Sequence, residues 1–393
     1  MQTYDVVMIG AGHNGLVCAA YLLKAGYKVL LLERRSVPGG AATTEEAMPD
    51  EAPGFKFNLC AIDHEFIHLA PVVQELELHK YGLEYLFCDP MVFCPHPDGK
   101  VFLGHRSLTK TCAQIAQYSA RDAQKYGEFI AYWQQVVNAM TPLFNAPPTA
   151  ILEIFGNFDR PKLQDLLSVA GSPNKAIDFI RTMLMSAEDL LNEWFDTEIV
   201  KAPLARLAAE LGVPPSQKNL AIGAMMLSLR HHPGMARPQG GTGALTQALV
   251  KLVHHLGGEI LTDQSVKQVL VDNGRAVGVR VASGKEYRAS RGVISNIDAK
   301  RLLLNLVDEP DVHAADPNLR DRVDRRIVNN NETILKVDCA LTEPLRFAHH
   351  DHKDDYLIGS ILIADSMRHV EIAHADPAIG NFMLQFISPS GAI

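Results

Sequence analysis

Three glycines near the amino terminus have the spacing of a loop that binds the phosphates of a dinucleotide. Gly10, Gly12 and Gly15 form the pattern Gly-x-Gly-x-x-Gly, and His13 and Asn14 lie between the last two. In such loops the first glycine makes a tight turn, the second lets the backbone approach a pyrophosphate, and the third lets a helix pack closely on a sheet. The free N–H groups and the positive dipole end of that helix then bind the phosphates. We therefore expect all five residues to contact a dinucleotide.

An acidic residue follows at the distance expected for binding a ribose. Glu33 lies eighteen residues after Gly15, and there its carboxylate can accept hydrogen bonds from the ribose hydroxyls. The acid disfavours a 2′-phosphate, but Arg34 and Arg35 follow it directly and would attract one. These three residues are predicted to contact the cofactor, and they leave FAD, NAD and NADP open.

A second glycine motif favours FAD. Gly39 and Gly40, followed by Ala41, come shortly after the acid. A nicotinamide dehydrogenase with a single cofactor has no obvious use for this motif. In a flavoprotein it would supply another close approach of the backbone to the pyrophosphate. The alternative is an ordinary loop turn, because glycine is common in turns.

The elements around these motifs form a β-α-β unit. The apolar run at residues 4–9 predicts a buried parallel strand. A helix is expected to begin in the glycine loop, because Leu16, Ala19 and Leu23 share one face. A second strand is expected at residues 27–32. The uncharged run from position 6 to position 23 is long enough to span a membrane, but its glycines favour strand, loop and helix instead.

Longer stretches of the chain resemble the flavin-containing amine oxidase and phytoene desaturase superfamily. Within that superfamily the sequence is most similar to the desaturase-like β-carotene ketolase family. The resemblance extends from residue 1 to about residue 375 and rests on these stretches: 10–16, 32–41, 60–66, 202–206, 236–245 and 292–299. The family continues beyond the end of this chain with a segment that completes its FAD domain, so the resemblance implies a C-terminal truncation.

The resemblance implies a cofactor, a substrate and a reaction. FAD is expected as the cofactor, with the backbone at Val266 contacting its adenine end; a buried strand valine is the equal alternative. The expected reaction is oxidation of a β-carotene ring methylene, at C4, to a ketone, giving echinenone and canthaxanthin. A desaturase or isomerase of linear carotenes is the alternative enzyme, and a truncated, non-catalytic dinucleotide-binding protein is the alternative of another class. No side chain is assigned a catalytic role.

The expected fold is α/β, with a Rossmann-like FAD-binding domain of the amine-oxidase type. A mixed α+β, helix-rich substrate domain is expected to interrupt it. The predicted boundaries are 1–70 and 236–305 for the FAD-binding domain, and 71–235 and 306–393 for the substrate domain.

Periodicity predicts further elements in both domains. Helices are expected over positions 126–140, ending before Pro142, over 176–192 and over 240–255. Strands are expected at these positions: within 85–103, at 259–262, 266–271, 277–281 and 293–295, and at 333–341 and 360–364. The aromatic helix that contains Tyr126, Phe129 and Trp133 is expected to be buried in the core rather than at a membrane surface.

Composition limits the classes of partner. The net charge of −8 disfavours a nucleic-acid partner. The six cysteines form no Cys-x-x-Cys pair, which indicates reduced thiols in a cytoplasmic setting. No metal is expected, because the histidines and aspartates of 349–355 are interpreted as a solvated loop. A carotenoid is a lipid-dissolved hydrocarbon, so the chain is expected to bind the surface of a membrane peripherally.

One polar pair lies where the superfamily approaches its flavin ring. Asp63 and His64 follow a segment with Asn58-Leu59-Cys60, where many members of the superfamily have Asp-x-Gly. We interpret the pair as structural and hydrogen-bonded. A contact near the ring or at the substrate entrance is the alternative.

Overall fold

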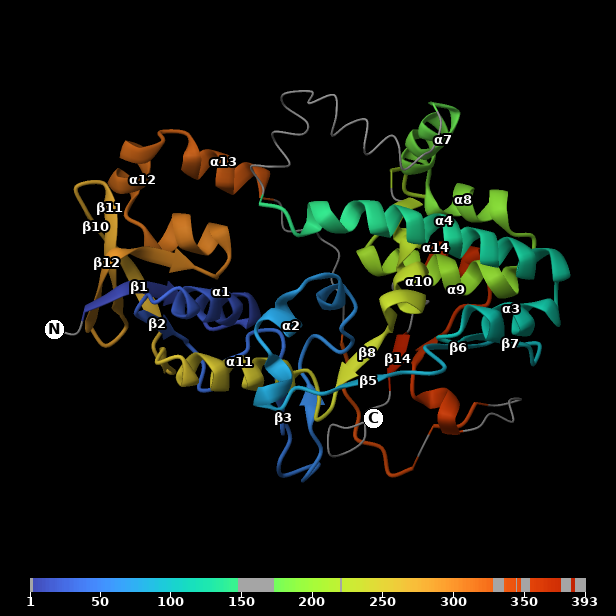
Figure 1. The fold of residues 1–393 in the computed structure, drawn as a ribbon, viewed down its shortest axis with the longest axis horizontal. Coiled ribbons are helices and arrows are strands. Elements are labelled where there is room, and N and C mark those ends of the chain that lie inside the picture. Colours follow the sequence, from blue (N-terminus) through green and yellow to red (C-terminus); the bar gives the residue numbers. More distant parts are fainter. Residues whose placement is uncertain are drawn as a thin grey trace.

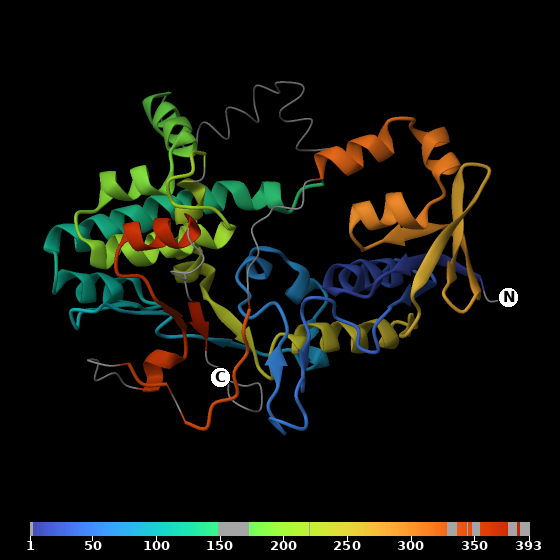
Figure 2. The same ribbon diagram turned by 180° about the vertical axis from the view of Figure 1, so that it is seen from behind.

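The computed structural model describes residues 3–147, 173–219, 221–327, 336–343, 345–347, 354–375 and 383–385. A six-stranded sheet, with strands in the order β10-β11-β12-β1-β2-β9, forms one side of the molecule. A mainly helical region built around α4 forms the other side (Figures 1 and 2). Both views show the connecting segments, among them α2 (Val72–Glu75), lying between these two regions.

Four neighbouring parallel strands form the part of the sheet that is typical of dinucleotide-binding domains. They are β12 (Glu286–Ser295), β1 (Thr3–Ile9), β2 (Val29–Leu32) and β9 (Glu259–Leu261), each parallel to its neighbour. All four residues of β2 are buried, as expected for a strand covered on both faces. The helices α1 (His13–Lys24) and α11 (Gly243–His255) cover one face and share a hydrophobic core with it.

An antiparallel ribbon extends the same sheet. β10 (Val266–Asp272) pairs with β11 (Arg275–Val281), and β11 pairs with the first residues of β12. The strand predicted at 293–295 is confirmed by its parallel pairing with β1, but it is longer than predicted, because it forms the end of the ten-residue β12. Its polar middle, with Ser290 and Arg291, does not end the strand because its backbone pairs with β1 on both sides of this stretch.

The helical half has a large aromatic core. Tyr126, Phe129 and Trp133 of α4 (Ala120–Phe144) are each 0% exposed, which confirms the expected burial of this helix. The prediction that the helix ends before Pro142 is wrong: the proline lies inside α4. It lies in the last turn, where a missing N–H and the ring clash disturb few further hydrogen bonds.

The helix predicted over 176–192 is two helices. α7 (Pro173–Leu184) ends before Ser186, and α8 (Ala187–Trp194) begins after it. Ser186 Oγ accepts a hydrogen bond from the Asp189 N–H, and the Asp189 carboxylate accepts one from the Ser186 N–H. This capping box starts a new helix and therefore interrupts the apolar period.

Three smaller sheets lie outside the six-stranded sheet in the described residues, and the shortest strands, β3 and β4, form one of them. Another has the order β14-β13-β6-β7, and the third pairs β5 with β8. The strands predicted within 85–103 and at 360–364 are confirmed. The strand predicted at 333–341 is wrong for its described part, since residues 336–341 form no strand and Val337 is 71% exposed. Among the described residues no strand pairs with this segment; positions 333–335 lie outside them.

The remaining elements have the following bounds: strands β3 (Thr44–Glu45), β4 (Phe57–Asn58), β5 (Tyr85–Phe87), β6 (Val92–Pro95), β7 (Val101–Gly104), β8 (Ala236–Pro238), β13 (Ser360–Leu362) and β14 (Met383–Gln385), and helices α3 (Leu108–Ala116), α9 (Glu198–Ala208), α10 (Met226–Leu229), α12 (Glu309–Ala315), α13 (Leu319–Arg326) and α14 (Met367–Ala375). Shorter turns include η1 (Phe66–Leu69), η2 (Leu78–Tyr81), η3 (Ala209–Leu211) and η6 (Arg301–Leu306). Among the described helices, none is both long and apolar enough to cross a membrane.

Candidate dinucleotide-binding site

The first glycine motif forms the connection from β1 to α1, and backbone or side-chain atoms of neighbouring residues lie close to where its Cβ atoms would be. Gly10 has φ +91°, a conformation that favours glycine. A Cβ on Gly15 would lie 2.7 Å from the Gly10 carbonyl oxygen, and a Cβ on Gly12 would lie 3.2 Å from Asn296 Nδ2. These contacts explain the spacing: the helix begins directly beside the end of the strand.

The second glycine motif lies against the first. The Gly39 N–H donates to the Ala11 carbonyl oxygen at 2.8 Å. A Cβ on Gly40 would lie 3.0 Å from the Gly12 Cα, and Gly40 has φ +64°. The two motifs therefore form one surface of bare backbone at the amino terminus of α1. Ala41, which follows, is exposed.

Glu33 is fixed at the end of β2 by two backbone donors. Its Oε2 accepts a hydrogen bond from the Ala11 N–H at 2.9 Å, and its Oε1 accepts one from the Arg35 N–H at 3.0 Å. The residue is only 7% exposed. Each carboxylate oxygen can accept more than one hydrogen bond, so both retain capacity for ribose hydroxyls.

The two arginines after the acid are placed differently. Arg35 makes a bidentate contact to the Glu45 carboxylate at 2.7 and 2.8 Å, while Arg34 is exposed. Because Glu45 already engages Arg35, this cation is less available for a 2′-phosphate. The arrangement therefore agrees with FAD or NAD better than with NADP.

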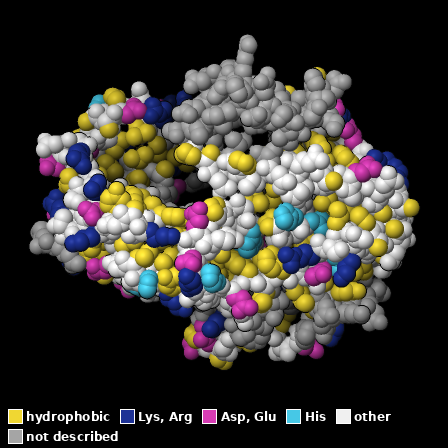
Figure 3. Space-filling view, in the orientation of Figure 1, with side chains coloured by type: hydrophobic (Ala, Val, Ile, Leu, Met, Phe, Trp, Pro, Cys, Tyr) yellow, Lys and Arg dark blue, Asp and Glu magenta, His cyan; other side chains and the backbone are white. Residues whose placement is uncertain are grey.

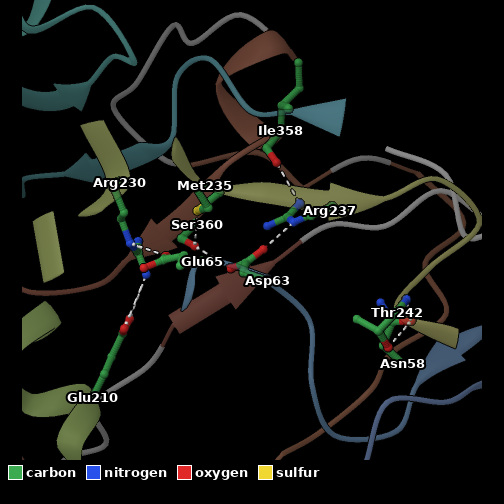
Figure 4. Close-up of polar contacts among 10 residues, drawn as sticks. All are labelled: Asn58, Asp63, Glu65, Glu210, Arg230, Met235, Arg237, Thr242, Ile358 and Ser360. Atoms are coloured by element: carbon green, nitrogen blue, oxygen red, sulfur yellow. Dashed lines mark hydrogen bonds and ion pairs between the residues drawn. The ribbon is translucent and has the colours of Figure 1, made fainter. Parts of the chain in front are cut away.

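Asn296 lies beside the glycine loop, and Asn58 holds the turn before α11. Sequence reasoning assigned neither of them to the site. The Asn296 N–H donates to the Ile9 carbonyl oxygen at 2.9 Å, so this residue follows β12 directly beside the glycine loop. Asn58 Oδ1 accepts from the Thr242 N–H at 3.0 Å and from Thr44 Oγ1 at 2.6 Å (Figure 4). Both asparagines lie next to or within motifs already noted, but only the fold brings Asn296 to the glycine loop and Asn58 to Thr242.

Val266 lies at the wall of a separate pocket. It is 5% exposed at the start of β10, and it lines a pocket of about 540 Å³ together with Asp298 and Leu306. The Gln264 N–H, two residues earlier, donates to the Glu33 carbonyl oxygen at 2.8 Å. A contact of Val266 with an adenine stays a prediction. The hydrogen bond from Gln264 brings the segment before β10 to Glu33, the residue predicted to bind the ribose.

A histidine cluster lies on the α1 side of the loop. His13 is the first residue of α1, and its buried Nδ1 has no hydrogen-bond partner among the described residues. His64 Nδ1 lies 2.9 Å from Tyr85 Oη, and the His64 N–H donates to the Ala236 carbonyl oxygen. Burial, with repulsion from His68, lowers the pKa of His64 to about 4. Asn14, beside His13, is exposed.

Asp63 and His64 do not pair with each other. Asp63 Oδ1 accepts from Arg237 Nε at 2.7 Å (Figure 4), whereas His64 contacts Tyr85. Neighbouring residues of an extended segment project to opposite sides, so each finds its own partner. The interpretation of a mutually hydrogen-bonded pair is therefore wrong, since each side chain bonds to a different partner.

The residues at this site fit a dinucleotide. Bare backbone at Gly12 and Gly40 leaves room for a pyrophosphate at the amino terminus of α1, where free N–H groups favour an anion. The fixed carboxylate of Glu33 suits a ribose. These residues bind and orient a cofactor; in the described residues no side chain at the loop is arranged as a nucleophile with its base.

Replacing Glu33 with Ala is expected to weaken binding of FAD about tenfold or more, because a hydrogen bond to a charged group contributes about 1.5–3 kcal/mol. Titration of the apoprotein with FAD, followed by flavin fluorescence, measures the change. The exposed Glu51→Ala variant is the control and should bind as the unchanged chain does. Equal affinity of the Glu33→Ala protein would count against the ribose assignment.

Comparison with known proteins agrees with this site. Residues 8–72 match the family model of the NAD(P)-binding Rossmann-like domain. Over 78% of its length the chain is 32% identical to pyridine nucleotide-disulfide oxidoreductase domain-containing protein 2 of Rattus norvegicus, covering 55% of that protein. It is 30% identical to one of the subunits of the limonene dehydrogenase of Castellaniella defragrans, with coverage of 76% of this chain and 51% of that protein.

A carotenoid enzyme and a solved structure are also similar. The prolycopene isomerase of Daucus carota is 28% identical over 75% of this chain and 46% of its own length. The crystal structure of an oxidoreductase from Methanosarcina mazei superposes with a TM-score of 0.52 at 19% identity, covering 82% of this chain and 65% of that one. The chain thus has the predicted α/β fold with a Rossmann-like domain, and it spans about half the length of the relatives it matches.

Proposed function

We propose that this chain is an FAD-dependent oxidoreductase that acts on an isoprenoid hydrocarbon. The observation that carries the proposal is the paired glycine surface, in which Gly40 lies against Gly12 at the start of α1, with the Glu33 carboxylate beside it. In the sequence, the second glycine motif favoured FAD over a nicotinamide cofactor, because it would let the backbone approach the pyrophosphate at a second point. Bound FAD would supply the oxidising centre, and the protein would supply binding, orientation and exclusion of water.

The similar proteins support the substrate class. Limonene and prolycopene, which appear in the names of two relatives, are both isoprenoid hydrocarbons without a charged group. Recognition of such a molecule depends on apolar burial, at about 25 cal/mol per Å². Figure 3 shows a hollow near the middle of one face with hydrophobic side chains along part of its border, a surface suited to such a ligand.

Within this class the proposed reaction is the C4 oxidation of β-carotene to echinenone and canthaxanthin. Its support is the resemblance of the motifs at 10–16, 236–245 and 292–299 to the carotene ketolase family. Desaturation or isomerisation of a linear carotene is the second candidate, and the similarity to a prolycopene isomerase favours it. Loading the FAD-reconstituted protein with β-carotene, phytoene or prolycopene and identifying the products by chromatography separates them.

Each product pattern has one meaning. Ketones formed from β-carotene would support the ketolase, whereas double bonds formed in phytoene or isomerised prolycopene would support the second candidate. Bound FAD without turnover of any of the three carotenoids would contradict the hydrocarbon substrate. Failure to bind FAD would contradict the oxidoreductase itself.

We also propose that α7 contacts the membrane that holds such a substrate. Ile177, Ile180 and Leu184 lie on one face of this helix and are 65%, 53% and 60% exposed. Burying one such side chain in lipid contributes about 1.5–3 kcal/mol. Ile180→Glu is therefore expected to weaken binding to phosphatidylcholine vesicles about tenfold or more in a flotation assay.

An exposed apolar residue elsewhere supplies the control for this prediction. Val337 is 71% exposed and does not belong to α7, so Val337→Glu should float with vesicles as the unchanged chain does. Equal flotation of the Ile180→Glu protein would contradict the role of α7.

A further inference from the structure

His13 has a position that links it to the charge of a bound dinucleotide. It follows Gly12 directly and is the first residue of α1, the helix end at which the glycine surface would hold the phosphates. An anion seated there lies within a few ångströms of the first helical side chain, because it contacts the N–H groups of the first turn. His13 is the titratable side chain of this loop.

The described protein offers no negative charge to this imidazole. Its Nδ1 is buried without a hydrogen-bond partner among the described residues, and burial lowers the pKa of His13. A protonated imidazole would leave a buried N–H without an acceptor, which is unfavourable. In the unliganded chain His13 is therefore held in the neutral form near neutral pH.

The groups that face His13 from the packed segments do not supply a counter-charge either. His64 repels it when both are protonated, and burial lowers the pKa of His64 to about 4. Around His64, burial also lowers the pKa of His68 on η1 and raises that of Tyr85 on β5 above its usual value. All three are neutral near pH 7. The Glu33 carboxylate accepts hydrogen bonds from the Ala11 and Arg35 N–H groups rather than from His13.

We propose that His13 takes up a proton when the dinucleotide binds, so that cofactor affinity increases as the pH falls through the neutral range. The inference rests on the proposed function, because it needs a pyrophosphate at the glycine surface. Two negative charges beside the ring favour the imidazolium form and raise the pKa of His13 in the complex. His13 is thus a binding residue whose contribution depends on protonation.

The sign of the pH dependence follows from linkage. At a pH above both values of the His13 pKa, free and bound, the ring is neutral in both states and binding is weakest. Between them, binding takes up a proton and the affinity rises up to about tenfold for each unit that the pH falls. At a pH below both pKa values, the ring is charged in the free and in the bound protein, and the affinity no longer changes with pH.

Isothermal titration calorimetry of the apoprotein with FAD measures this proton directly. Repeating the titration at pH 6, 7 and 8 in buffers with different ionisation enthalpies gives the number of protons taken up. We expect a clear uptake for the unchanged chain at one or more of these pH values. His13→Asn, which keeps a polar group near the Nδ1 position but does not titrate, should bind FAD without that uptake.

Three further variants make the result specific. His79→Asn removes an exposed histidine outside this cluster and should leave the uptake unchanged. His64→Asn should also leave it unchanged, because His64 is neutral throughout this pH range. Should His13→Asn fail to fold by circular dichroism, His13→Gln replaces it.

The outcomes separate this inference from the proposed function. If the unchanged chain does not bind FAD at any pH, the proposed function fails. If it binds FAD without proton uptake at all three pH values, or if the uptake persists in both folded His13 variants, only the role of His13 is overturned. Uptake that disappears with His13 and persists without His64 and His79 supports it.

Discussion

Replacing Gly12 with Val is expected to abolish FAD binding while the chain still folds. A Cβ at this position would lie 3.2 Å from Asn296 Nδ2 and 3.8 Å from the Gly40 Cα. The two further methyl groups of valine would occupy the space over the bare backbone, which the pyrophosphate needs. We expect the affinity to fall about 100-fold or more, equivalent to about 3 kcal/mol. Flavin absorbance after gel filtration of the reconstituted protein measures the loss.

A glycine with open surroundings supplies the matched control. A Cβ on Gly292 of β12 would have no heavy atom of the described protein within 4 Å beyond its chain neighbours, and Gly292 pairs with Val6 in the sheet, away from the loop. Gly292→Val should therefore retain FAD. A folded Gly12→Val protein with its full flavin content would disprove the pyrophosphate site.

Replacing Arg230 with Met is expected to lower the free energy of unfolding by about 3–5 kcal/mol, because it leaves a buried charge without its partner. Arg230 is 2% exposed, and its Nε lies 2.9 Å from Glu65 Oε1 (Figure 4). Its Nη2 lies 3.2 Å from Glu210 Oε1. Urea denaturation followed by tryptophan fluorescence, compared with the unchanged chain, measures the loss.

A double variant and an exposed pair test the reason for this effect. Adding Glu65→Leu to the Arg230 variant removes the orphaned charge and should recover part of the stability. Arg181→Met, which breaks an exposed ion pair with Glu193, should cost about 1 kcal/mol or less. If the Arg230 and Arg181 variants lose equal stability, burial of the cluster does not explain the effect.

The sequence predicted the dinucleotide half well because its signals are local. The first glycine motif comprises Gly10, Gly12 and Gly15 within one short loop. The positions of β1, α1 and β2 follow from the sequence directly around it. The second glycine motif at Gly39 and Gly40 predicted another close approach of the backbone to the pyrophosphate. The contact of Gly40 with Gly12 agrees with that expectation.

The residues that the sequence did not reveal act through long-range contacts. Asn296 reaches the loop because β12 pairs with β1 almost three hundred positions away in the chain. Asn58 and Thr242 meet although they lie 184 positions apart. The missing strand at 336–341, the described part of the strand predicted at 333–341, has the opposite cause. Its pattern favours a strand, but pairing requires a neighbour that local sequence does not specify.

The most direct test of the account is the flavin content of the purified chain after reconstitution with FAD. The account predicts a flavin absorbance spectrum and about one FAD per chain, released as FAD on denaturation. The same preparation should bind NADP more weakly than FAD, because a 2′-phosphate would meet the Glu33 carboxylate at the proposed ribose position and Arg35 is engaged by Glu45. A folded chain that binds no FAD would contradict the central claim.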